Sequence, residues 1–192
     1  AAPLKEPDQY PAAPESAYGW SKLMGEYETI LMGKETGIPV SVLIFHNVYG
    51  APCDYSMDKS QVIPSLIRKA VNYPNEPFHV WGSGSQGRAF VHVNDIVDAL
   101  VLTKEKGFGM GPIQIGPDKC ITIKEIAETI VEISKKNIDV YYDSSKPQGD
   151  TGRCADYSKA KKVLGWEPAT SLYDGLKDLY LWVQARMAKD NK

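Results

Sequence analysis

Apolar and polar positions follow a helical period at the start of the chain and then give way to a short apolar run. Residues 17 to 36 show the helical period, with Ser16 in the N-cap position and Gly37 and Pro39 as stop signals. The following run, "PVSVLIFHNVYG", is rich in β-branched residues and predicts a strand buried on both faces. We therefore expect a long helix that leads into a buried strand.

The remainder of the chain continues to alternate between helical and strand-like patterns. Helices are predicted over residues 60–72, 94–106, 122–136, 156–165 and from 171 to near the end, and strands over 78–81, 88–93 and 139–143. Asn94 and Asp156 stand where N-caps are expected, and Thr122 with Glu125 forms a capping box. No repeat and no linker is visible between residues 37 and 189. The pattern predicts an α/β fold.

Composition and charge narrow the class of protein. The chain has 192 residues, of which 43% are hydrophobic and 24% are charged, and its net charge is −2. This is typical of one globular domain or a large piece of one. Without a block of like charge, neither nucleic acid nor a membrane surface is an expected partner. We find no apolar run of ~18 residues and no leader pattern, and we expect a cytoplasmic protein.

The three cysteines are odd in number and far apart in the sequence. Cys53, Cys120 and Cys154 form no CxxC motif and have no nearby pair of histidines. This argues against both a disulfide framework and a zinc site. We expect three reduced thiols and no metal.

A Tyr and a Lys four residues apart carry the first candidate chemistry. The spacing YxxxK occurs five times, and Tyr18 and Lys22 lie in a long predicted helix, where such residues share a face. That face is separate from the apolar stripe, which comprises Leu23, Tyr27, Ile30 and Leu31. A nearby ammonium lowers the pKa of a phenol from about 10, so the pair can exchange a proton with a hydroxyl group. A solvated Tyr and Lys on a helix flank fits the spacing equally well.

Five sequence blocks occur in an order that resembles a known family. They are "AYGWSKLMGE", "FHNVYG", "WGSGSQGRAFVHVNDIVDAL", "PIQIG" and "GDTGRCADYSKAKKVLGWEP". Together they resemble the extended short-chain dehydrogenases of the NAD-dependent epimerase/dehydratase family, which act on nucleotide sugars. The resemblance runs from about residue 10 to 185, and within the family the chain looks most like the GDP-mannose 3,5-epimerases.

The resemblance implies the C-terminal part of a Rossmann-type enzyme. Residues 1–50 would be the tail end of the dinucleotide-binding domain, and residues 51–192 would be a substrate-binding region with interleaved returning elements. The chain starts with a Pro-rich segment and no Met, and we expect the N-terminal dinucleotide-binding half to lie upstream. By this resemblance Tyr18 is the proton acceptor and donor, and Tyr18 and Lys22 contact NAD or NADP. We expect no full NAD site on this chain alone.

The substrate would be held by four other residues. Arg88 and Arg153 lie beside glycines, and a guanidinium group suits a diphosphate, although both could equally be surface arginines. The resemblance assigns both to the diphosphate of a nucleotide sugar, together with Asn47, and places Trp81 near the base or ribose. Other polar and aromatic residues of these blocks are interpreted as structural, namely Asp95, Asp156 and Trp166.

The motif "GSGSQG" has the glycine spacing of a dinucleotide-binding loop. Gly82, Gly84 and Gly87 match GxGxxG, but that fingerprint requires a helix to open at the last glycine. The following "RAFVHV" is strand-like. We interpret the loop as a turn between two strands.

Two positions depart from the family pattern. Ile44 replaces an expected Arg, and Gln61 replaces the Lys or His that 3,5-epimerase-like members use as a second acid/base. A Gln has no titratable proton, so a 4-epimerase, a reductase and a dehydratase remain open. A further alternative is a non-catalytic binding module, and we expect a homodimer through the helix over residues 17–36.

Overall fold

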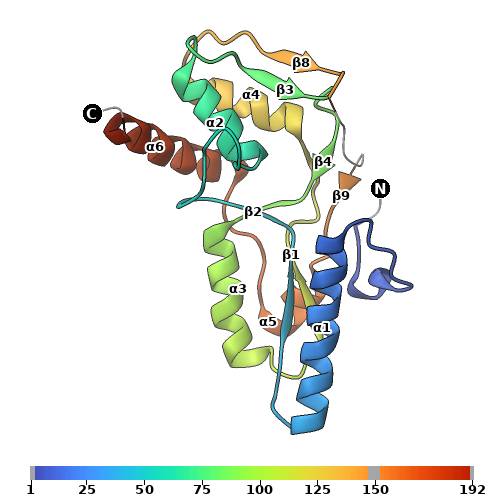
Figure 1. Ribbon diagram of the computed structural model, residues 1–192. Coiled ribbons are helices and arrows are strands. Elements are labelled where there is room, and N and C mark those ends of the chain that lie inside the picture. The colour runs from blue at the N-terminus through green and yellow to red at the C-terminus, as the bar shows by residue number, and fades with distance from the viewer. Residues whose placement is uncertain (1–2, 147–151, 191–192) are drawn as a thin grey trace.

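The structure, a computed structural model, describes residues 3–146 and 152–190 (Figure 1). The helices are η1 (Glu6–Gln9), α1 (Ala17–Thr36), α2 (Val62–Asn72), α3 (Val93–Lys106), α4 (Ile123–Ser134), α5 (Ser158–Leu164) and α6 (Leu172–Asp190). The strands are β1 (Val42–Phe45), β2 (Asn47–Tyr49), β3 (His79–Trp81), β4 (Gly87–Arg88), β5 (Phe90–His92), β6 (Pro112–Ile115), β7 (Ile121–Thr122), β8 (Tyr141–Asp143) and β9 (Gly152–Arg153). The predicted α/β class is confirmed.

The first long helix, α1, has the predicted limits. The Ser16 hydroxyl accepts a hydrogen bond from the backbone N–H of Gly19, which satisfies a donor that the first turn cannot pair internally. At the other end, Gly37 has a φ of 71°, a left-handed conformation that glycine adopts without a steric penalty. No residue of α1 is buried.

The apolar run after α1 forms two strands instead of one. β1 pairs in parallel with β6 and β2 pairs in parallel with β5, so the chain changes neighbours at His46. The prediction of a strand buried on both faces was wrong, because Phe45 and Val48 are exposed. The sequence pattern could not show this change, since it depends on which distant strand lies on each side.

Strand pairing is mostly parallel. β3 pairs in parallel with β8, and β4 lies between β7, which is antiparallel to it, and β9, which is parallel to it. Parallel neighbours require crossover connections, which the intervening helices provide. The three-stranded sheet around β4 therefore brings together segments from three parts of the chain.

Two separate clusters of buried side chains form the core. One lies among α2, α4, α6 and β3 in the upper part of Figure 1, and includes Ile67, Phe78, Ile126 and Leu179. The other lies among α3, α5 and β6 in the lower part, and includes Ile113. The strands β2 and β4 lie at the level where the two parts meet.

The N-cap residues of two helices differ from those that the sequence predicted. The N-cap of α3 is His92, whose Nδ1 accepts from the backbone N–H of Asn94, so the prediction of Asn94 as the cap was wrong. The cap residue of α5 is Tyr157, although the carboxylate of Asp156 does accept from the backbone N–H of Ser158. Hydrogen bonds from the hydroxyl group and the backbone N–H of Ser158 hold the pKa of Asp156 below its usual value.

Two other predictions, one at a helix start and one in the core, are confirmed. Thr122 and Glu125 form the predicted capping box of α4. Trp166 is buried, and its indole N–H donates to the backbone oxygen of Asp95 at 2.8 Å. The capping box therefore stabilises the start of α4, whereas the Trp166–Asp95 hydrogen bond joins segments 71 positions apart in the sequence.

The cysteines provide the clearest correction. Cys120 and Cys154 form a disulfide, with their Cα atoms 5.3 Å apart, so the prediction of three reduced thiols holds only for Cys53. The two residues are 34 positions apart in the sequence. Sequence spacing carried no signal, because it is the pairing of β7 and β9 with β4 that brings them together.

The described part of the chain holds neither a membrane-spanning helix nor a metal cluster. Within residues 3–146 and 152–190, no helix is long and apolar enough to cross a membrane. The same ranges contain no cluster of three His, Cys, Asp or Glu side chains arranged to hold a metal ion.

Candidate functional site

A short ladder of backbone hydrogen bonds brings three of the predicted substrate residues together. Ala89, which follows Arg88, accepts at its oxygen from the N–H of Asn47 at 3.1 Å and donates its own N–H to the oxygen of Arg153 at 2.9 Å. Arg88 is directly opposite Arg153 in the pairing of β4 with β9. Three segments far apart in the sequence therefore place Asn47, Arg88 and Arg153 next to one another.

These three residues line one pocket, which has a volume of about 370 Å³. His46 and Gln114 also line it, as does the N-terminal segment of residues 4–9. Residues with guanidinium and amide side chains, from three strands, thus line a common space, and such side chains suit an anionic ligand.

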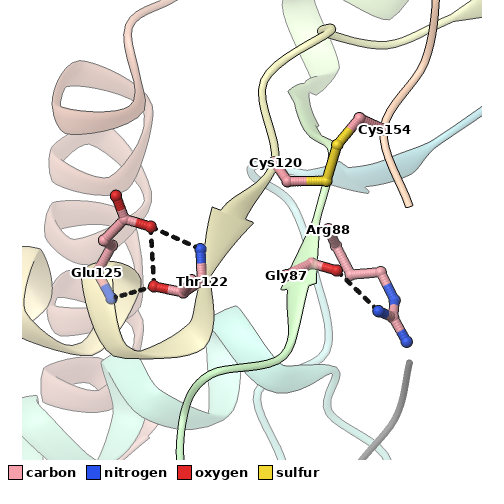
Figure 2. The surroundings of a disulfide bond; sticks show 6 residues. All are labelled: Gly87, Arg88, Cys120, Thr122, Glu125 and Cys154. Atoms are coloured by element: carbon pink, nitrogen blue, oxygen red, sulfur yellow. Dashed lines mark hydrogen bonds between the residues drawn. A yellow bond between two sulfur atoms is a disulfide. The ribbon is translucent and has the colours of Figure 1, made fainter. Parts of the chain in front are cut away.

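The pocket also contains carboxylates from its N-terminal wall. Glu6 accepts at its side chain from the backbone N–H of Gln114 at 2.9 Å, and Asp8 accepts from the backbone N–H of Lys5 at 2.7 Å. Both carboxylates are thus held by backbone donors. Beside β4, an Nη1–H of Arg88 donates to the oxygen of Gly87 at 2.7 Å (Figure 2).

Sequence reasoning missed His46 and Gln114. The Gln114 amide donates from Nε2 to the oxygen of Leu4 at 2.8 Å, so its Oε1 accepts from His46 Nε2 at 2.9 Å. This arrangement assigns the proton of a neutral His46 to Nε2 and leaves Nδ1 as the acceptor. Gly116 permits the approach, since a Cβ there would lie 2.8 Å from the Cβ of His46. The signal available in the sequence was His46, a polar residue directly before Asn47 in "FHNVYG".

The Tyr and Lys pair lies on α1 and does not line this pocket. Tyr18 is 72% exposed, and the Nζ of Lys22 lies 5.2 Å from the centre of its ring. The two side chains therefore share a face, as the i, i+4 spacing requires. That face is open to a ligand.

Trp81 is also separate from the pocket. It is 60% exposed on β3, and its ring faces the Nζ of Lys146 at 5.9 Å. The structure therefore brings together Asn47, Arg88 and Arg153, but does not add Trp81 to them.

The glycine motif is a loop between strands, as predicted. Gly82 and Gly84 have φ values of 77° and 78°, and Gly87 begins β4 instead of a helix. The loop therefore lacks the helix N-terminus that receives the pyrophosphate in a dinucleotide fingerprint.

These observations define an α/β protein with mostly parallel strand pairing and a pocket lined by two arginines. Comparison with known families identifies it further: residues 1–116 match the NAD dependent epimerase/dehydratase family. The chain belongs to this family.

Individual relatives are consistent with that assignment. The chain is 32% identical over 187 residues to GDP-mannose 3,5-epimerase 1 of Oryza sativa subsp. indica, covering 97% of this chain and 49% of the relative. It is 36% identical over 140 residues to GDP-L-fucose synthase 1 of Arabidopsis thaliana, covering 71% of this chain and 43% of the relative.

A solved structure agrees with these relatives. The UDP-glucuronic acid 4-epimerase of Bacillus cereus, in complex with UDP-glucuronic acid and NAD, superposes with a TM-score of 0.83 at 28% identity. The match covers 97% of this chain and 57% of that one. The chain spans about half the length of the curated relatives it matches.

Proposed function

We propose that this chain carries the Tyr–Lys pair and the substrate pocket of an NAD(P)-dependent nucleotide-sugar epimerase or dehydratase. The observation that carries the proposal is the convergence of Asn47, Arg88 and Arg153 on one pocket. In this proposal residues 1–50 complete a dinucleotide-binding domain and residues 51–192 form the substrate-binding region.

The pocket supports binding of a diphosphate. Each guanidinium group offers a planar fork of N–H donors that matches two phosphate oxygens, and the Asn47 amide adds a neutral donor. The positive charges of the two arginines attract the negative charge of a diphosphate. The carboxylates of Glu6 and Asp8, which line the same pocket, each accept a hydrogen bond from a backbone N–H. UDP-glucuronic acid, which is bound in the Bacillus cereus complex, contains such a diphosphate.

Tyr18 and Lys22 support the proton chemistry. A phenolate at Tyr18 removes the proton from a sugar hydroxyl group, and the Lys22 ammonium stabilises that phenolate and donates to the ribose of the cofactor. The exposed face of α1 leaves room for both ligands. NAD, when bound, supplies the hydride acceptor at this point. The described residues offer the ribose contacts but not a glycine-rich pyrophosphate loop.

Arginine-to-lysine substitutions test the diphosphate pocket. We expect Arg88→Lys and Arg153→Lys each to weaken binding of UDP or GDP by about 10- to 150-fold, the equivalent of one lost charged hydrogen bond. Arg186→Lys is the matched control, since Arg186 is exposed on α6 against the ring of Trp182. Equal affinities for all three variants in calorimetry would rule out the pocket as the diphosphate site.

A tyrosine-to-phenylalanine substitution tests the catalytic pair. In the full-length protein, Tyr18→Phe should lower turnover by roughly 10²- to 10⁴-fold, the usual contribution of a general acid/base, with little change in nucleotide binding. Tyr27→Phe, on the same helix but another face, should retain activity. Full turnover in Tyr18→Phe would assign the proton transfer to another residue.

A second candidate, a GDP-mannose 3,5-epimerase, is favoured by the 32% identity to the rice enzyme. Against it, Gln61 occupies the N-cap position of α2 and offers no titratable proton. We therefore expect the full-length protein not to exchange the C5 proton of a GDP-hexose in deuterated water. Deuterium at C5 by NMR, abolished by Lys59→Ala, would establish the 3,5-epimerase and place its second acid/base at Lys59.

The remaining alternative is a module that pairs through α1 without catalysis. In the structure Leu23 and Ile30 are partly covered, and four of the exposed apolar side chains of α1 recur with heptad-like spacing. They are Trp20, Met24, Tyr27 and Leu31. We propose that this face contacts a second copy of the chain, so Met24→Glu should shift the protein towards a monomer in light scattering. An unchanged mass would exclude this face.

A further inference from the structure

The disulfide lies beside the two arginines of the proposed diphosphate pocket. Cys120 directly precedes β7, and Cys154 directly follows β9. In the strand between them, Arg88 is paired with Ile121 on one side and with Arg153 on the other. Figure 2 shows the disulfide beside β4, the strand from which the Arg88 side chain extends.

The strand that carries Arg153 is short, and backbone hydrogen bonds from several segments hold it and the residues that follow it. β9 is two residues long, so its ladder with β4 contains few hydrogen bonds. The Ala89 N–H donates to the oxygen of Arg153 at 2.9 Å, the Leu4 N–H donates to the oxygen of Cys154 at 2.9 Å, and the Ala155 N–H donates to the oxygen of Pro117 at 3.1 Å. Short segments with few hydrogen bonds open at low free-energy cost. The disulfide adds a covalent bond next to Arg153 to these hydrogen bonds, and it limits how far β9 can move from β4.

We propose that the Cys120–Cys154 disulfide is a redox-controlled positioning device for the pocket. In the oxidised protein it holds β9 against β4, so that Arg153 and Arg88 face the diphosphate together. In the reduced protein β9 separates from β4 and the pocket loses affinity. This inference rests on the proposed function, because it describes regulation of the same site.

The switch requires an external dithiol as reductant. Its thiolate attacks one sulfur, the Cys120–Cys154 bond breaks, and a mixed disulfide forms. The second thiol of the reductant then releases the attacked cysteine as a thiol, and the reductant leaves as a cyclic disulfide. Two electrons and two protons have passed to the two cysteines. Cys120 is half-buried and Cys154 only 6% exposed, so we expect attack at Cys120.

The test compares the two redox states of the 192-residue chain in a Cys53→Ser background, which removes the third thiol. Titration with UDP and with GDP should show an affinity about three- to tenfold lower after reduction by dithiothreitol, since only the fraction with β9 in place binds. Reoxidation should restore it. A Cys120→Ser/Cys154→Ser variant should bind weakly with or without dithiothreitol. An affinity unchanged by reduction would overturn the inference and leave the proposed function intact.

Hydrogen exchange separates this inference from the proposed function. The Ala89 amide, which donates to Arg153, should exchange faster after reduction, while the amides of α4 remain protected. If the oxidised protein binds neither UDP nor GDP, the proposed function fails, and the Ala89 exchange still decides whether the disulfide holds β9. Unchanged exchange at Ala89, or loss of protection throughout α4, would contradict local control by the disulfide.

Discussion

Lys136 offers a direct test of how the upper core is held together. Its Nζ donates to the backbone oxygens of Ala70, Val71 and Tyr73 at 3.0, 2.6 and 3.0 Å, so all three ammonium hydrogens are used. These oxygens lie at the C-terminal end of α2, where carbonyl groups lack intrahelical partners. The positive charge of Lys136 also interacts favourably with the negative end of the helix dipole.

Lys136→Met keeps the apolar length of the side chain and removes all three donors. An unsatisfied buried acceptor costs about 1–3 kcal/mol, and at this half-buried position water replaces part of the loss. We therefore expect the free energy of unfolding to fall by roughly 2–4 kcal/mol, a large part of the 5–15 kcal/mol typical of a domain. The melting temperature should fall by about 2–4 °C for each kcal/mol.

Urea denaturation followed by circular dichroism measures this change. The matched control is Lys135→Met, since Lys135 is the exposed C-cap residue of α4 and carries the same side chain one position earlier. We expect the control to change the free energy by less than about 0.5 kcal/mol. Equal destabilisation of the two variants would refute the view that the three hydrogen bonds, and not general charge, account for the effect.

Three further substitutions test other parts of the fold. Hydrogen bonds from Thr122 lower the pKa of Glu125 below its ordinary 4.5. The stabilisation that the ionised Glu125 provides is therefore present above that pH and is lost as the pH falls through the lowered value. Glu125→Gln should flatten the acid limb of a curve of stability against pH, and an unchanged limb would contradict this. The buried Asp95 carboxylate accepts hydrogen bonds from the 169–170 segment, and Asp95→Ala should lower the free energy of unfolding by about 2–4 kcal/mol in urea denaturation. Removing both Cys120 and Cys154 should cost roughly 4 kcal/mol, because the bond closes a loop with a sequence separation of 34. Identical urea midpoints for the oxidised chain and the double variant would contradict this.

The sequence by itself determined the features that depend on near neighbours. The ends of α1 follow from Ser16 and Gly37, and the start of α4 follows from the capping box, because each cap involves residues within about four positions. Tyr18 and Lys22 share a face for the same reason, since the helix repeats every 3.6 residues. The family blocks identified the arginines as candidates, but not where they lie.

Tertiary structure decided the features that depend on strand pairing. The run after α1 divides at His46 because its two halves pair with different strands, β6 and β5. The pocket exists because β4 pairs with β9, and the disulfide forms because β7 lies on the other side of β4. These neighbours are tens of residues apart in the sequence. No local pattern encodes such contacts, because they are selected by the free energy of burying and hydrogen-bonding the whole chain at once.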